Sequence, residues 1–192
     1  MNDFELYLRL GFAHIADWQA YDHIVFLIAL SSVFLLSEWR RVLWLVTAFT
    51  VGHSITLALS VFKIIVFPTE IIEFLIPITI LITSLVNAFE SQKDKTSSHY
   101  RSYFTTLFFG FIHGCGFSNY LNTILMNASD SIWQQLLAFN IGLEIGQLLI
   151  VTAILILSFF VVTMFHVEHT RWKLFVAGIT TGISLTLIMH NF

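Results

Sequence analysis

The sequence has little charge and almost no cysteine, and each shortage excludes a class of protein. Only 11% of the 192 residues are charged, whereas a soluble domain carries about 25%. Cys115 is the one cysteine, which excludes an intramolecular disulfide framework and a Cys-rich zinc or iron–sulfur site. The net charge is −3, and no basic patch favours binding of nucleic acid. The N-terminal residues M-N-D-F-E-L-Y lack a basic region followed by an apolar core, so no cleavable signal peptide is predicted.

Hydrophobic residues are abundant instead and predict a polytopic membrane protein. They make up 57% of the chain, and the mean hydropathy is +0.82. Because a membrane-spanning helix needs about 20 mostly apolar residues, we expect an all-α transmembrane bundle forming a single domain over residues 1–192. The predicted spans are residues 21–37, 42–62, 70–90, 103–121, 132–163 and 172–190. The fifth is longer than a bilayer requires, so it must tilt or project.

The segment before the first span predicts a short helix on the outer membrane interface. In D-F-E-L-Y-L-R-L-G-F-A-H-I, apolar residues at 4, 8, 12 and 15 oppose Glu5 and Arg9. Lysine and arginine predict the orientation, since they concentrate in alternate loops and only Arg9 and Lys63 fall on the other side. The alternate loops contain Arg40, Arg41, Lys93, Lys95, Arg101, Arg171 and Lys173. The positive-inside rule then places both termini outside the cytoplasm.

With this orientation, ionisable residues gather at mid-depth or in the outer half of the membrane. His53 lies about 12 residues from the cytoplasmic start of its span, or roughly 18 Å at 1.5 Å per residue. His113 stands at the same depth, and Glu144 lies about 12 residues in from the outer side. Asp22, His23 and Glu73 open their spans at the outer end. Scattered structural polar residues have no reason to share a level, so this pattern favours a common site.

Helical spacing also groups the polar residues on faces. Asn140, Glu144 and Gln147 follow the i, i+4, i+7 pattern of one stripe, and Gly142 and Gly146 form a small-xxx-small patch suited to close helix contact. Two other stripes consist of Glu73, Pro77, Ser84 and Asn87, and of Thr106, Gly110 and His113. We expect these stripes to converge inside the bundle.

Three interpretations of the buried polar residues remain open from the residues alone. A carboxylate at the bilayer centre costs about 2.5–3.5 kcal/mol, so Glu144 must be neutralised, paired or coordinated. Histidine nitrogens with carboxylate oxygens suit nickel, zinc, iron or cobalt rather than calcium or magnesium. The same groups could pass on a proton. Alternatively, the histidines pack against Ser or Thr of neighbouring helices, and Glu73 compensates a helix dipole.

Five blocks of the sequence together resemble the HupE/UreJ family of small bacterial inner-membrane proteins. They are G-F-A-H-I…Y-D-H-I-V-F (11–26), F-T-V-G-H-S-I-T-L (49–57), E-F-L-I-P-I-T-I-L-I-T-S-L-V-N (73–87), F-F-G-F-I-H-G-C-G-F (108–117) and F-N-I-G-L-E-I-G-Q (139–147). Members are regarded as nickel or cobalt permeases. The resemblance implies a metal-binding set of His14, Asp22, His23, His53, Glu73, His113 and Glu144, supported by Asn87, Asn140 and Gln147.

Two functions follow, and a third is structural. As a permease of the bacterial inner membrane, the protein would take Ni²⁺ or Co²⁺ from Asp22 and His23 at the outer face to His53, His113 and Glu144. As a membrane-embedded hydrolase open to the outer leaflet, it would hold zinc or iron, with Glu144 or Glu73 as general base. A scaffold would bind no metal. The sequence leaves open whether the protein forms a homo-oligomer.

An uptake path meets one difficulty in the sequence. The cytoplasmic half of the predicted bundle offers only Ser84, Asn87 and Thr106, with no second ionisable residue on the way in. Transport would need such a residue, or would rely on backbone carbonyls and water.

Overall fold

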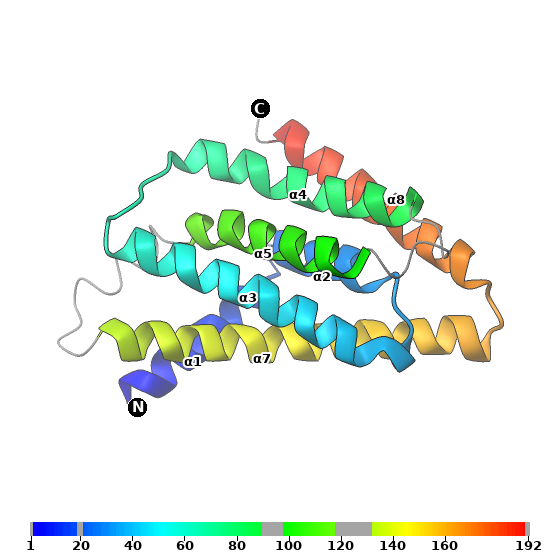
Figure 1. The fold of residues 1–192 in the computed structure, drawn as a ribbon, viewed down its shortest axis with the longest axis horizontal. Coiled ribbons are helices and arrows are strands. Elements are labelled where there is room, and N and C mark those ends of the chain that lie inside the picture. The colour runs from blue at the N-terminus through cyan, green and yellow to red at the C-terminus, as the bar shows by residue number, and fades with distance from the viewer. Residues whose placement is uncertain (1, 19–20, 90–97, 118–131, 191–192) are drawn as a thin grey trace.

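The predicted helical architecture is confirmed by a computed structural model, which describes residues 2–18, 21–89, 98–117 and 132–190. Within these residues the chain is helical and contains no strand (Figure 1). Its helices are α1 (Asp3–Ile15), α2 (Asp22–Ser31), α3 (Trp39–Val61), α4 (Thr69–Phe89), α5 (Ser98–Gly116), α7 (Ile132–Phe159) and α8 (His169–His190). A 3₁₀ turn, η1 (Leu36–Glu38), precedes α3, and a π-helical segment, η3 (Phe160–Met164), extends α7.

Every predicted span coincides with a helix, but the helices differ in length. Within the described residues, four segments are long and apolar enough to cross a membrane: Leu36–Val61, Thr69–Phe89, Ile132–Met164 and His169–His190. Helix α2 has 10 residues, about half of what a crossing needs. The end of the fourth predicted span, residues 118–121, lies outside the described residues, as does residue 90. The structure therefore confirms a membrane helix bundle, and six crossings stay a prediction.

Helix α2 ends at two serines, earlier than hydropathy predicts. The Ser31 hydroxyl donates to the Leu27 carbonyl at 2.5 Å, and the Ser32 hydroxyl donates to the Ala29 carbonyl at 3.2 Å. Hydroxyl bonds of this kind also occur in the middle of α3 and α4, so they accompany the end of α2 and do not by themselves cause it. Leu35 is then extended, and its N–H donates to the Glu38 carboxylate at 3.2 Å. The Glu38 side chain thus closes the turn that leads into α3.

The helices pack in pairs on either side of a central group (Figure 1). Helix α4 lies along α8 on one side, α1 crosses α7 on the other, and α2, α3 and α5 lie between them. Phe26 of α2, Phe49 of α3 and Phe139 of α7 are fully buried in this central region. The core is therefore aromatic where the three helices meet.

Glycines allow two of the crossings to be very close. In the α3–α5 pair, a Cβ at Gly110 would lie within 3.1 Å of the His53 backbone nitrogen and closer still to the Phe49 carbonyl oxygen. In the α1–α7 pair, a Cβ at Gly11 would collide with the Phe139 carbonyl, and a Cβ at Gly142 with the Leu8 carbonyl. Side chains other than hydrogen would push these backbones apart. The close contact predicted for the Gly142 patch is confirmed, with α1 as its partner.

The predicted N-terminal helix is present as α1 and begins at a polar cap. Asn2 accepts a hydrogen bond from the Phe4 N–H at 3.3 Å, which is the usual role of an N-cap side chain. Tyr7, Gly11 and Ile15 are buried against the bundle. Helix α1 is thus an integral part of the packing, and its place at the membrane interface stays a prediction.

Candidate metal centre

Four of the predicted histidines meet at one place, and each comes from a different helix. His14 stands near the end of α1, His23 at the start of α2, His53 in α3 and His113 in the last turn of α5. The ring centroids of His14 and His23 lie 4.8 Å apart, and those of His23 and His113 lie 4.9 Å apart. His53 is 6.0 Å from His14 and 6.3 Å from His23. Both close glycine crossings therefore serve this cluster.

The nitrogen atoms of the cluster are spaced for a metal ion. One ring nitrogen each of His14, His23 and His53 lies within 4.8 Å of the other two. Ligands on a tetrahedral ion at 2.0–2.1 Å stand about 3.3 Å apart, so the rings would have to close by about 1.5 Å at most. A rotamer adjustment of this size suffices without unfolding a helix.

Several ring nitrogens are buried and have no hydrogen-bond partner among the described residues. They are His14 Nε2, His23 Nε2, both nitrogens of His53, and His113 Nδ1. His53 and His113 are fully buried, and His23 is 5% exposed. A buried polar atom left unsatisfied costs about 1–3 kcal/mol, and here such atoms concentrate in one cluster. Coordination of one cation could compensate one nitrogen of each ring.

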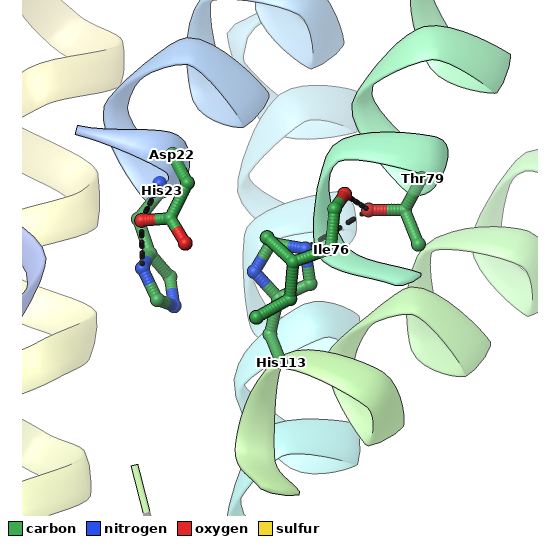
Figure 2. Close-up of polar contacts among 5 residues, drawn as sticks. All are labelled: Asp22, His23, Ile76, Thr79 and His113. Atoms are coloured by element: carbon green, nitrogen blue, oxygen red, sulfur yellow. Dashed lines mark hydrogen bonds and ion pairs between the residues drawn. The ribbon is translucent and has the colours of Figure 1, made fainter. Parts of the chain in front are cut away.

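Asp22 fixes the orientation of His23. Its Oδ1 lies 3.1 Å from His23 Nδ1 and also accepts the backbone N–H of His23 at 2.8 Å (Figure 2). A carboxylate at this nitrogen favours the proton on Nδ1, which leaves the lone pair on Nε2. Carboxylate–histidine pairs of this kind orient metal ligands and raise their basicity. The structure thus gives Asp22 a supporting contact to a ligand.

Thr79 does the same for His113. The Thr79 hydroxyl donates its hydrogen to the Ile76 carbonyl at 2.7 Å and lies 2.9 Å from His113 Nε2 (Figure 2). With its hydrogen on the Ile76 carbonyl, the hydroxyl accepts from Nε2–H of His113. The lone pair of His113 is then on Nδ1, the atom without a partner among the described residues. This arrangement favours the tautomer that can bind a cation.

The environment of the cluster is apolar and favours neutral rings. Burial lowers the pKa of His14 well below its ordinary value, and the neighbouring His23 and His53 lower it further. Phe26 and Phe49 lie 5.2 and 5.1 Å from the His113 ring. These phenylalanines add apolar contacts to the His113 ring.

The predicted glutamates lie outside this cluster. Glu73 is exposed on α4. Glu144 is partly buried on α7 and accepts a hydrogen bond from the Thr47 hydroxyl of α3 at 2.8 Å. The structure brings together four predicted histidines with Asp22, and whether the two glutamates bind metal stays a prediction.

Of the predicted supporting polar residues, Gln147 and Asn87 have contacts outside the cluster, whereas the Asn140 side chain interacts with His53. Gln147 accepts from the Thr50 hydroxyl at 2.8 Å, and Asn87 donates to the Ala29 carbonyl at 2.7 Å. Asn140 donates to the Leu136 carbonyl at 2.8 Å, while its Oδ1 is buried without a hydrogen-bond partner among the described residues. The α7 stripe therefore faces α3, as its spacing predicts.

Sequence reasoning foresaw Ser or Thr partners for the histidines, and the contact of Thr79 with His113 is of that kind, but it did not identify which threonines have partners on other helices. Thr79 is not on the α4 stripe that contains Glu73, Pro77, Ser84 and Asn87, and Thr47 and Thr50 look like ordinary residues of an apolar helix. Threonine hydroxyls in helices usually bond their own backbone, so their sequence position gives no sign of a partner. Only the spacing of Thr47 and Thr50, one turn apart like Glu144 and Gln147, could have suggested the pairing.

Comparison with known proteins identifies one related group. The model of a protein family described as HupE / UreJ protein matches residues 1–192, which is the whole chain. No curated protein and no solved structure matches the chain. The match includes all four helices that contribute a histidine to the cluster.

Proposed function

Because the chain belongs to the HupE/UreJ family, we propose that it is a membrane permease for nickel or cobalt that binds its cargo through His14, His23, His53 and His113. The observation that carries the proposal is the concentration of unpartnered, buried imidazole nitrogens at one point. An all-imidazole set suits nickel, cobalt, zinc or copper and disfavours magnesium or calcium. In this proposal the membrane is the bacterial inner membrane, with both termini outside the cytoplasm.

The order of burial suggests how the ion enters. His14 is partly exposed, whereas His23, His53 and His113 are buried. An ion would meet His14 first and exchange its water for the deeper nitrogens. Because the nitrogens are spaced up to 4.8 Å apart, part of the binding free energy is used to close the rings. Binding weakened in this way suits a permease, which must release its cargo.

Glu144 of α7, opposite Thr47 of α3, would be the next binding group on the path of the ion. Its partner Thr47 precedes His53 by six residues, which is about 9 Å at 1.5 Å per residue. The Thr50–Gln147 pair lies between these levels. In this proposal the ion passes from the imidazoles to oxygen ligands of Gln147, Thr47 and Glu144, which meets the need for an ionisable residue beyond the histidines.

The enzyme alternative has less support. A hydrolase needs an open coordination position and a base beside it, but His53 and His113 are fully buried. Glu73, one of the two predicted bases, is exposed on α4 and outside the cluster. Hydrolysis therefore remains an outcome of the test below rather than a second proposal.

The test combines metal content with transport. Purified protein is loaded with Ni²⁺, Co²⁺ or Zn²⁺ and analysed by mass spectrometry, and cells expressing the same variants take up radioactive nickel. His53→Ala should lose both bound metal and uptake. Glu144→Gln should keep bound metal and lose uptake, because it removes only the next binding group on the path. His166→Ala is the matched control, since His166 is exposed and bonds the Met164 carbonyl.

Each outcome decides between the functions. Tightly held zinc without uptake of any metal would replace the permease by the enzyme. Absence of metal from the wild type after loading would leave the histidines as packing residues. Equal metal content in His53→Ala and His166→Ala would exclude the cluster as the binding site.

A further inference from the structure

A second feature lies at the other end of the bundle, where a cavity of about 550 Å³ opens among five helices. It is lined from the end of α2, the start of α3, the end of α4, the start of α5 and the start of α8. Arg101 of its lining precedes His113 by 12 residues of α5, which is about 18 Å. This cavity, here called the basic pocket, is thus separate from the histidine cluster.

Positive charge dominates the lining. Arg41, Arg101 and Lys173 face one carboxylate, that of Glu38, among the described lining residues. Glu38 offsets one of these three charges, since one of its oxygens lies 3.8 Å from Arg41 and the other accepts the Leu35 N–H at 3.2 Å. A cation leaving the histidine cluster would be repelled here, so the pocket suits an anion.

The Arg41 guanidinium is held in the pocket wall. It stands 5.0 Å above the Phe34 ring, and its Nε is buried without a hydrogen-bond partner among the described residues. A charged donor with a buried, unused N–H is expensive unless an acceptor can reach it. A ligand with oxygen atoms would supply that acceptor.

Helix ends add to the positive potential. The first turns of α3, α5 and α8 line the pocket through Arg41, Arg101 and His169. N-terminal turns present unpaired N–H groups and a positive dipole end, which together favour phosphate. The C-terminal ends of α2 and α4 also reach the pocket and oppose this effect in part. The balance of three N-termini and the basic side chains still favours an anion.

The rest of the lining is apolar. Phe34, Leu45, Ile82 and Phe109 border the same space as the basic residues, and Phe109 and Leu45 are buried core residues. A cavity that combines cations with apolar walls fits an amphiphile better than a fully hydrated ion. Basic pockets between membrane helices on the cytoplasmic side are sites for lipid head groups, and the lysine and arginine distribution predicts that this end faces the cytoplasm.

We propose that the basic pocket binds a phosphate group, carried by an anionic phospholipid of the cytoplasmic leaflet. Arg41 and Arg101 contact the phosphate oxygens from α3 and α5, and the apolar walls hold the start of the acyl chains. The bound lipid ties together helices that carry His53 and His113 in their other halves. This inference does not depend on the transport of a metal.

The experiment titrates purified protein in a neutral detergent with dioctanoyl phosphatidylglycerol and follows the melting temperature. Dioctanoylglycerol, which lacks the phosphate, and inorganic phosphate are titrated in parallel. The variants are Arg41→Gln and Arg101→Gln, and the matched control is Arg40→Gln, whose side chain is exposed and lies over Trp39. Each pocket variant should bind phosphatidylglycerol about fivefold more weakly, and Arg40→Gln should bind as the wild type does.

The parallel titrations identify the source of the phosphate. Stabilisation by phosphatidylglycerol but not by inorganic phosphate supports the lipid. If inorganic phosphate stabilises with the same dependence on Arg41 and Arg101 and displaces the lipid, the pocket binds a soluble phosphate and the lipid assignment is overturned. Equal stabilisation by dioctanoylglycerol, or equal affinity in all three variants, overturns the phosphate site itself. Because Arg101 is exposed, Arg101→Gln should fold even if Arg41→Gln does not.

Discussion

The crossing of α1 over α7 makes a sharp prediction about Gly11. This glycine is three residues before His14 on α1, and it faces the Phe139 carbonyl and the Leu143 N–H of α7. Replacing it with alanine adds one methyl group at the closest point of the crossing. The substitution leaves every histidine in place in the sequence, so it tests whether tertiary packing sets the geometry of the cluster.

The size of the displacement follows from the contacts. The added carbon would lie 2.7 Å from the carbonyl carbon of Phe139 and 3.0 Å from the nitrogen of Leu143, whereas ordinary contact begins at 3.4 Å. Helix α1 must therefore move by at least about 0.7 Å, because backbone atoms cannot yield as a flexible side chain does. A shift of His14 away from the cluster would add to the gap of about 1.5 Å that the rings must already close to bind an ion, and binding would weaken because metal–ligand distances tolerate only about 0.2 Å.

We expect Gly11→Ala to bind nickel about 10–100-fold more weakly, the loss typical of misoriented metal ligands. We also expect it to unfold at a lower temperature, because overpacking lowers the free energy of unfolding by about 1–3 kcal/mol. Nickel titration by calorimetry on purified protein measures the first effect. Gly182→Ala is the matched control: it is also a helical glycine, but no atom lies within 4 Å of an added Cβ. Both substitutions gain the same helix propensity, about 1 kcal/mol.

One result would refute this reasoning. If Gly11→Ala binds nickel as tightly as Gly182→Ala while keeping its helix content, the crossing does not position His14. A parallel His14→Ala variant shows why Gly11→Ala would bind normally. If His14→Ala binds nickel weakly, His14 is a ligand and α1 adapts to the added methyl group. If His14→Ala also binds nickel normally, His14 is not in the ligand set.

Two other substitutions test individual hydrogen bonds of the described structure. Thr79→Val should weaken nickel binding about tenfold, since His113 loses the acceptor that selects its tautomer. Thr83→Val removes only a bond to the Thr79 carbonyl and should bind nickel normally. An equal loss of binding in both variants would contradict the role of Thr79 at His113. Ser84→Ala removes the 2.7 Å bond between α4 and α8 and should cost about 0.6 kcal/mol in the membrane. Ser184→Ala, whose hydroxyl bonds only its own helix at Thr181, should leave the thermal unfolding temperature nearer the wild-type value.

The membrane character and the helices could be predicted from the sequence because both depend on local properties. Long apolar runs have to be helical in a bilayer, where each backbone polar group must find its partner within the segment. Hydropathy therefore located α2, α3, α4, α5, α7 and α8, and the amphipathic pattern located α1. Hydropathy did not predict that α2 ends at Ser31 and is followed by the turn that Glu38 closes, because mean hydropathy contains no information on such hydrogen bonds.

The candidate site was predictable in its residue types but not in its membership. The depth of His53 and His113 indicated a shared site, since a fixed rise per residue converts sequence position into height. The depth of a residue in the membrane does not specify toward which neighbouring helix its side chain points. Glu144 has the right depth but faces Thr47, and Glu73 is at the start of α4 yet exposed.

The sequence by itself thus determined that this chain is a helical membrane protein with ionisable side chains at a common level. Only the tertiary structure decided which of them meet. Glycines let α1 pack closely on α7, and α7 in turn packs against α2 and α3. This sets His14 near His23 and His53 across gaps of 9 to 39 residues in the sequence. The physical reason is that helix formation is a local property of the chain, whereas a metal centre depends on distances between helices that only side-chain packing fixes.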